Sequence, residues 1–117
     1  MNDPIDNFHA RVRVENAAIR DLGPRLESIL PPGHELEFLG SGLIDVRAPN
    51  GRIVSIVATH EDPETGRATD ELRFDVSIIG PDGVEVDPAH SVLSVVGDEA
   101  VAGALLRQLR SVTDSDV

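Results

Sequence analysis

Apolar residues at spacings of three and four predict a long amphipathic helix in the first thirty residues of the chain. They fall on one stripe of a 3.6-residue helix and are Ile5, Phe8, Val12, Ile19, Leu22, Leu26 and Ile29. Asp3 before Pro4 suits a cap followed by proline at the first helical position. Gly23-Pro24 predicts a kink or a restart, because proline lacks the N–H that an intrahelical hydrogen bond needs.

A second pattern competes with the helix between residues 8 and 14. Phe8, Ala10, Val12 and Val14 alternate with polar residues, as the residues of a half-buried edge strand would. We favour the helix because its stripe continues well beyond this stretch. The strand stays an alternative.

From His34 onward the apolar period changes from three or four to two, which is typical of β-strands. The predicted strands are "HELEFLG" (34–40), "LIDVRA" (43–48), "RIVSIVATH" (52–60), "DELRFDVSII" (70–79) and "VEVD" (84–87). The residues expected to face inward are Leu36, Phe38, Ile44, Val46, Leu72, Phe74, Val76, Ile78, Val84 and Val86. Asn50-Gly51 is a strong hairpin signal, because both residues tolerate positive φ.

The connections between these strands are too short for parallel crossovers, so neighbouring strands must be antiparallel. Residues 88–96 fit either a helix opened by Asp87-Pro88 or a further strand. From Asp98 a second amphipathic helix is expected, with Val101, Ala104, Leu105, Leu109 and Val112 on its apolar side.

These elements predict an α+β fold, in which an antiparallel meander of about five strands carries an N-terminal and a C-terminal helix on one face. The chain of 117 residues has the length of a single domain, 1–117, whose ends, 1–4 and 113–117, are expected to fray. This order of elements resembles small acidic secretion chaperones in outline. Those proteins carry a further helix within the sheet, which this chain lacks, and none of their motif residues match.

Charge adds information about partners. The formal net charge is −11, and all ten basic residues are Arg. Residues 34–97 contain 12 acids and 4 Arg, whereas residues 1–33 contain 5 acids and 4 Arg, so the negative charge belongs mainly to the sheet. Such a field repels phosphate backbones and anionic lipids, so we expect neither nucleic acid nor membrane as partner, whereas a basic protein is attracted. Solubility alone also accounts for a net charge of this size.

Several chemistries are excluded or unsupported. Without Cys the chain has no disulfide, thiolate nucleophile or Cys-ligated metal, and without Lys it has no phosphate-binding "GxxxxGK[ST]" loop. No serine lies in a "GxSxG" setting. The chain has neither a leader pattern nor an apolar run long enough to span a bilayer, so we expect a cytoplasmic protein. We expect no catalytic residues and no cofactor.

The stretch "HEDPETGR" from His60 to Arg67 gathers acidic residues around one histidine. His60, Asp62 and Glu64 are weak candidates for metal ligands, but the calcium-loop pattern fails because Gly66 and Arg67 occupy the wrong positions. Ordinary turn chemistry explains the stretch better, as a hairpin loop running from Glu61 to Thr69.

The leading hypothesis is a non-catalytic acidic protein-binding module, such as an adaptor, a secretion chaperone or an immunity protein. Two helices cannot cover both faces of five strands, so the second face must meet water or a partner. The hypothesis expects a partner there, either a basic protein or a second copy of the chain, as a homodimer. The residues expected to form this contact are Glu35, Glu37, Asp45, Ile53, Val57, Glu71, Asp75 and Ile79. The alternatives are a small-ligand-binding protein or hydrolase with a pocket between helices and sheet near Phe38 and Phe74, and a structural subunit of a larger assembly.

Overall fold

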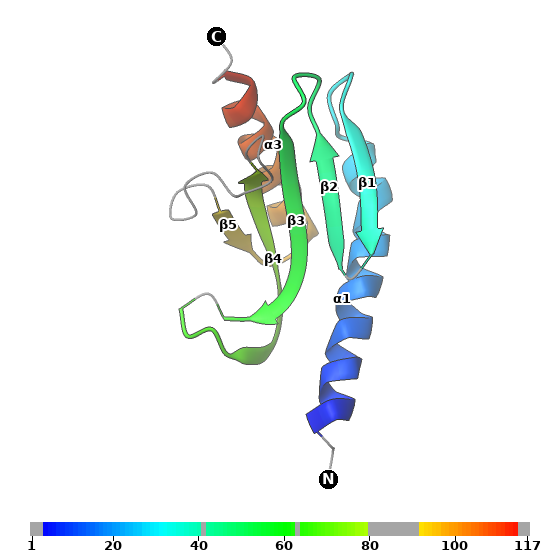
Figure 1. The fold of residues 1–117 in the computed structure, drawn as a ribbon, viewed down its shortest axis with the longest axis vertical. Coiled ribbons are helices and arrows are strands. Elements are labelled where there is room, and N and C mark those ends of the chain that lie inside the picture. The colour runs from blue at the N-terminus through cyan, green and yellow to red at the C-terminus, as the bar shows by residue number, and fades with distance from the viewer. Residues whose placement is uncertain (1–3, 41, 63, 80–91, 115–117) are drawn as a thin grey trace.

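The protein, seen in a computed structural model, is an α+β fold with a helix at each end of an antiparallel five-stranded meander. The structure describes residues 4–40, 42–62, 64–79 and 92–114. The elements are α1 (Pro4–Glu27), β1 (Glu35–Gly40), β2 (Leu43–Arg47), β3 (Ile53–Glu61), β4 (Ala68–Ile79), β5 (Val92–Val95) and α3 (Asp98–Asp114). Of the ends expected to fray, Pro4 belongs to α1 and residues 113–114 belong to α3. The strands lie in the order β1-β2-β3-β4-β5, and both helices lie on the same side of them (Figure 1).

Helix α1 confirms the helical alternative for residues 8–14. The stripe residues Ile19, Leu22 and Leu26 are buried, with exposed fractions of 4%, 1% and 0%. The restart expected at Gly23-Pro24 is wrong, because one helix runs through both residues to Glu27. Pro24 lies in the last turn of α1, so its missing N–H affects only the end of the helix. Leu22 and Leu26, on either side of Pro24, are buried in the core and hold this turn in place.

Helix α1 is also longer than the strands that it crosses. Its 24 residues extend about 36 Å, whereas the six residues of β1 extend about 20 Å. The N-terminal half of α1 therefore projects past the sheet, as Figure 1 shows, and Val14 in that half is 50% exposed.

The turn between β2 and β3 confirms the hairpin signal at Asn50-Gly51. Gly51 has φ of 86°, a value that favours glycine, and its N–H donates to the Ala48 carbonyl at 2.9 Å. The Arg52 N–H donates to the Asn50 side-chain oxygen at 3.0 Å. These bonds fix the register in which Arg47 lies opposite Ile53.

The hairpin between β3 and β4 is longer and its loop shorter than predicted. Glu61 still pairs with Ala68, so both strands extend into the stretch from Glu61 to Thr69 that was predicted as the loop. The Asp62 N–H donates to the Arg67 carbonyl and the Gly66 N–H to the Asp62 carbonyl, both at 2.8 Å. Backbone hydrogen bonds therefore extend the ladder further than the apolar alternation does.

The last strand of the sheet is β5 (Val92–Val95). Of the two alternatives for residues 88–96, a helix or a further strand, the strand is therefore confirmed for residues 92–95. It pairs antiparallel with β4, with Phe74 opposite Val95. The strand predicted at 84–87, with Val84, Glu85 and Val86, falls outside the described residues, as do residues 88–91.

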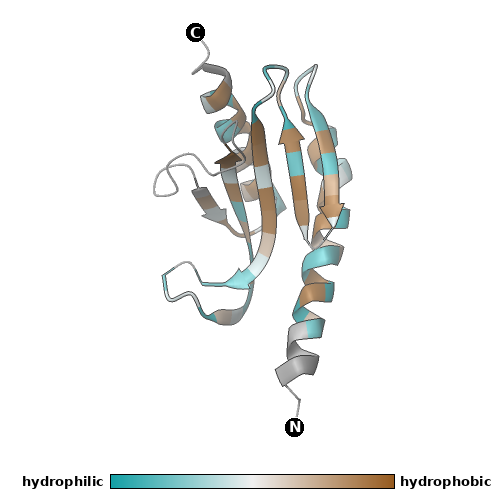
Figure 2. Ribbon diagram, viewed as in Figure 1, coloured by the Kyte–Doolittle hydropathy of each residue, from teal (hydrophilic) through white to brown (hydrophobic). Residues whose placement is uncertain are grey.

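The core lies between the two helices and one face of the sheet, here called the helix face. This face bears the even-numbered side chains of β2, β3 and β4, and the apolar ones that are at most 8% exposed are Ile44, Val46, Val54, Ile56, Ala58, Phe74, Val76 and Ile78. Val101, Leu105 and Leu109 of α3 complete the same cluster. Figure 2 shows the hydrophobic and hydrophilic bands that alternate along β2.

Phe38 differs from the other predicted inward residues. It belongs to the helix face, but it is 46% exposed because β1 stands at the edge of the sheet. Its ring packs on Gly23 of α1, where a Cβ atom would lie only 2.0 Å from Phe38 Cζ. Glycine at position 23 is thus the residue that lets the edge strand approach the helix.

Candidate functional site

The strand register gathers most of the predicted contact residues on the face opposite the helices, here called the polar face. It bears the odd-numbered side chains of β1–β4 together with Ser94 of β5, and most of the predicted residues fall in three adjacent cross-strand rows, whose neighbours are about 5 Å apart. The first row contains Glu35, Arg47, Ile53 and Ile79, the second Glu37, Asp45, Ser55 and Ser77, and the third Leu43, Val57, Asp75 and Ser94. Seven of the eight predicted residues therefore lie in adjacent rows.

The carboxylates of this face differ in their surroundings. Glu35 and Glu37 on β1 are exposed, whereas Asp45 and Asp75 are half-buried. Asp45 Oδ1 accepts a hydrogen bond from Ser55 Oγ. Within the described part of the chain, Glu35, Glu37 and Asp75 form no ion pair, so their charge is available to a partner.

Glu71, the eighth predicted residue, lies apart from the others. It is eight residues from Ile79 along β4, a distance of about 26 Å in an extended strand. Its Oε1 accepts a 2.7 Å hydrogen bond from Arg73 Nη1, and Arg73 Nε also donates to Ser94 Oγ at 3.1 Å. Glu71 is therefore neutralised by a neighbour on its own strand and stands outside the acidic group near β1.

The aliphatic residues of the polar face form two separate pairs. Ile53 lies opposite Ile79, and Val57 lies opposite Asp75 on one side and Leu43 on the other. The row with Ser55 and Ser77 separates them. These two serines are 8% and 4% exposed, so the small side chains lie below their neighbours, whereas Ile53, Val57 and Ile79 are half-buried.

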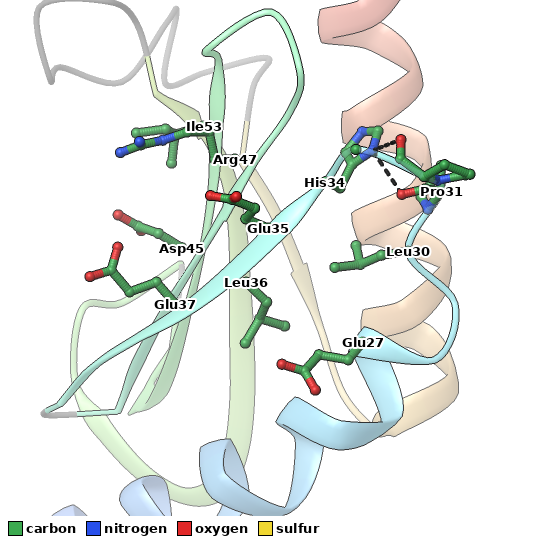
Figure 3. A pocket seen from close by; sticks show the side chains of 12 residues that line it. Glu27, Leu30, Pro31, His34, Glu35, Leu36, Glu37, Asp45, Arg47 and Ile53 are labelled. Atoms are coloured by element: carbon green, nitrogen blue, oxygen red, sulfur yellow. Dashed lines mark hydrogen bonds between the residues drawn. The ribbon is translucent and has the colours of Figure 1, made fainter.

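A groove of about 660 Å³ follows β1, and the sequence did not reveal it. Its lining includes Glu35, Glu37 and Asp45 from the polar face, and Leu30 and Leu36 on the side of the helices. Figure 3 shows these two groups on opposite sides of the β1 ribbon. The turn at the entry of β1 is held by His34, whose Nδ1 lies 3.1 Å from the Pro31 carbonyl oxygen. The only sequence signal for this groove was the position of β1 at the start of the meander.

The weak metal candidates do not converge. His60 is 8% exposed and points toward α1, where its Nδ1 lies 2.8 Å from Glu15 Oε2. The Asp62 carboxylate accepts a hydrogen bond from the Glu64 N–H at 2.8 Å and so takes part in the turn. In the described ranges, no three His, Asp or Glu side chains are placed to hold a metal ion.

The space between helices and sheet is occupied mainly by side chains. Ile44, Ile56 and Leu105 are 0% exposed there. Beside α1 a cavity of about 170 Å³ is lined by Asn16, Ile19, Arg20, Phe38, Gly40 and Gly42. It lies near Phe38, as the small-ligand alternative expected, but not near Phe74. That alternative stays a prediction.

Comparison with known proteins adds no assignment: the chain matches no protein-family model, no curated protein and no solved structure. In the part of the chain that the structure describes, no helix has both the length and the apolar character required to cross a bilayer.

Proposed function

We propose that the chain is a non-catalytic protein-binding module whose polar face, with the adjacent edge strand β1, recognises a basic protein partner. The observation that carries the proposal is the register of β1, β2, β3 and β4. It places Glu35, Glu37 and Asp45 beside the Ile53–Ile79 pair on the face that the helices leave uncovered.

The electrostatics of this face favour a cationic partner. Its eight-residue predicted set contains five carboxylates, and the same face carries two arginines, Arg47 and Arg73, of which Arg73 is bound to Glu71 and Ser94. Complementary charge accelerates encounter and selects against acidic partners. The carboxylates supply orientation and rate in this mechanism.

The half-buried aliphatic pairs supply the part of the contact that excludes water. Ile53 and Ile79 are cross-strand neighbours, so a partner side chain can cover both at once. In protein interfaces, the residues that contribute most of the binding energy commonly form an apolar centre surrounded by a polar rim. The polar face has that composition on a small scale.

The experiment is affinity capture from host lysate on three immobilised forms of the chain. They are the natural chain, a face variant with Ile53→Thr and Glu37→Gln, and a control variant with Leu106→Gln and Glu99→Gln in exposed positions of α3. Threonine keeps the β-branched shape that strands favour. We expect a basic protein to be retained by the natural chain and the control, to elute with salt, and to be lost from the face variant.

Retention of the same proteins by all three forms would contradict the proposal. Recovery of nothing, together with a monomeric sedimentation profile, would contradict it too. A dimeric profile abolished only in the face variant would show that the partner is a second copy of the chain, which is the homodimer alternative.

A further inference from the structure

Strand β1 is an open edge of the sheet. It pairs with β2 on one side, and no other described strand pairs with it. Five of its six residues are exposed, including Phe38 and Leu39 at 46% each. Native proteins usually protect such an edge with charged side chains, Lys above all, or with Pro, a covering segment or a bulge, and Glu35 and Glu37 supply charge at this edge. Here the sequence Glu35–Gly40 contains neither Lys nor Pro, and the register shift comes only at its end, between Phe38 and Gly40.

The groove beside this edge presents different chemistry above and below the sheet. On the polar face its wall carries Glu35, Glu37 and Asp45, with Arg47 and Ile53 beside them. On the other side it carries Leu36 and Leu30, with Glu27 at the end of α1 (Figure 3). A strand laid along β1 points successive side chains to opposite faces. Every second side chain would therefore meet Glu35 and Glu37, and those between would meet Leu36 and Phe38, on the side where Leu30 and Glu27 also line the groove.

A second copy of the chain fits this edge poorly. When two β1 strands pair antiparallel around a twofold axis, Glu37 of one copy lies opposite or diagonal to Glu37 of the other in each register that pairs at least four residues. Like charges at such positions are destabilising. The acidic residues thus disfavour self-pairing at the same edge whose backbone groups remain available to a different chain.

We propose that β1 binds an extended segment of the partner protein by strand addition, and that this segment alternates Arg or Lys with aliphatic residues. The inference rests on the proposed function and names the partner's chemistry and its mode of binding. In strand addition the backbone hydrogen bonds supply affinity, and alternate side chains supply specificity. The basic side chains would lie beside Glu35 and Glu37, and the aliphatic ones beside Leu36 and Phe38.

Synthetic peptides test the proposal directly. The first is a ten-residue peptide that alternates arginine and valine, and the second has the same composition arranged as five arginines followed by five valines. A third alternates arginine and valine but carries N-methyl groups on alternate backbone amides at the edge facing β1. Binding to the isotopically labelled chain is followed by NMR, together with the hydrogen-exchange rates of the β1 amides.

We expect the alternating peptide to bind, to slow exchange of the β1 amides, and to bind more tightly than the block and N-methylated peptides. A variant with Glu35→Gln and Glu37→Gln should weaken its binding on the order of tenfold, as two lost cross-strand charge pairs predict. Glu64→Gln and Glu99→Gln, both far from β1 in the chain, serve as the matched control and should leave binding unchanged. Melting temperatures verify that the variants are folded.

The outcomes separate this inference from the proposed function. Equal binding of all three peptides, with shifts on the polar face but unchanged β1 exchange, would overturn strand addition and leave recognition of a basic partner standing. Absence of binding by any peptide would overturn strand addition, and the lysate capture above would then decide the proposed function separately. Concentration-dependent dimerisation with slowed β1 exchange in the chain alone would overturn it in favour of self-pairing.

Discussion

The two faces of the sheet carry alternate residues of the same strands, yet they meet very different surroundings. On the helix face Val46, Val54 and Ile56 are 0% exposed beneath α1 and α3. On the polar face Ile53 and Val57, from the same strand as Ile56, are half-buried among serines and carboxylates. The difference indicates that packing on the helix face contributes more to stability than packing on the polar face does.

The prediction with the largest expected effect compares isoleucine-to-alanine substitutions at two positions of β3, one on each face of the sheet. Ile56→Ala should lower the free energy of unfolding by about 2–5 kcal/mol, because it leaves a cavity in a fully buried site. Ile53→Ala on the polar face should cost about 1 kcal/mol, which reflects a typical partly exposed substitution. Urea denaturation measures both. Equal costs would show that the polar face is as fully packed as the helix face.

A second prediction concerns the contact between Gly23 of α1 and Phe38 of the edge strand β1, where the helix face ends. Gly23→Ala should destabilise the protein by about 1–3 kcal/mol, because the added methyl displaces the Phe38 ring from α1. In a Phe38→Ala background the same change should instead stabilise by up to about 1 kcal/mol, through the higher helix propensity of alanine. A thermal denaturation cycle of the four proteins measures the coupling. Independent, additive effects would refute the contact.

A third test concerns the polar pair at the far end of β3, where the helix face ends. Glu15→Gln should cost about 1 kcal/mol, because it weakens a part-buried hydrogen bond to His60 while keeping an acceptor. Glu61→Gln, on the neighbouring exposed residue, should change the unfolding free energy by less than about 0.5 kcal/mol. Chemical denaturation at constant pH compares them. A larger effect at Glu61 would contradict this arrangement.

The smallest expected effect belongs to the ion pair between the two helices. Arg25 Nη1 lies 2.9 Å from Asp98 Oδ2, and both side chains are at least half exposed. Arg25→Gln should therefore cost less than about 1 kcal/mol, and the cost should vanish near 1 M salt, where the screening length is about 3 Å. Melting curves at low and high salt measure it. A cost that persists in high salt would mean that Arg25 acts through packing.

The sequence was most informative where one local rule decided the structure. The period of two placed Ile44, Val46 and Val76 on the helix face, and Asn50-Gly51 specified its hairpin without tertiary information. The stripe of α1 correctly outweighed the alternation at residues 8–14. The same alternation also predicted which residues share the polar face, because the hairpins determine the cross-strand register.

Features that depend on segments far apart in the chain could not be predicted from local sequence patterns. The exposure of Phe38 depends on the absence of a further strand beside β1 among the described residues, and the groove depends on where the turn at Pro31 lies. The inward direction of His60 was available, since it continues the alternation of Ile56 and Ala58. Its partner Glu15, 45 residues earlier in the chain, was not.

The meander order has a consequence for how the molecule forms. Each strand pairs with the next one along the chain, so the sheet can assemble from successive hairpins with little loop-closure cost. Val101, Leu105 and Leu109 join the core from the last helix. A nascent chain that has not yet produced α3 would therefore expose Val76 and the apolar residues around it, a surface prone to aggregation. Docking of the seventeen-residue helix α3 covers this surface.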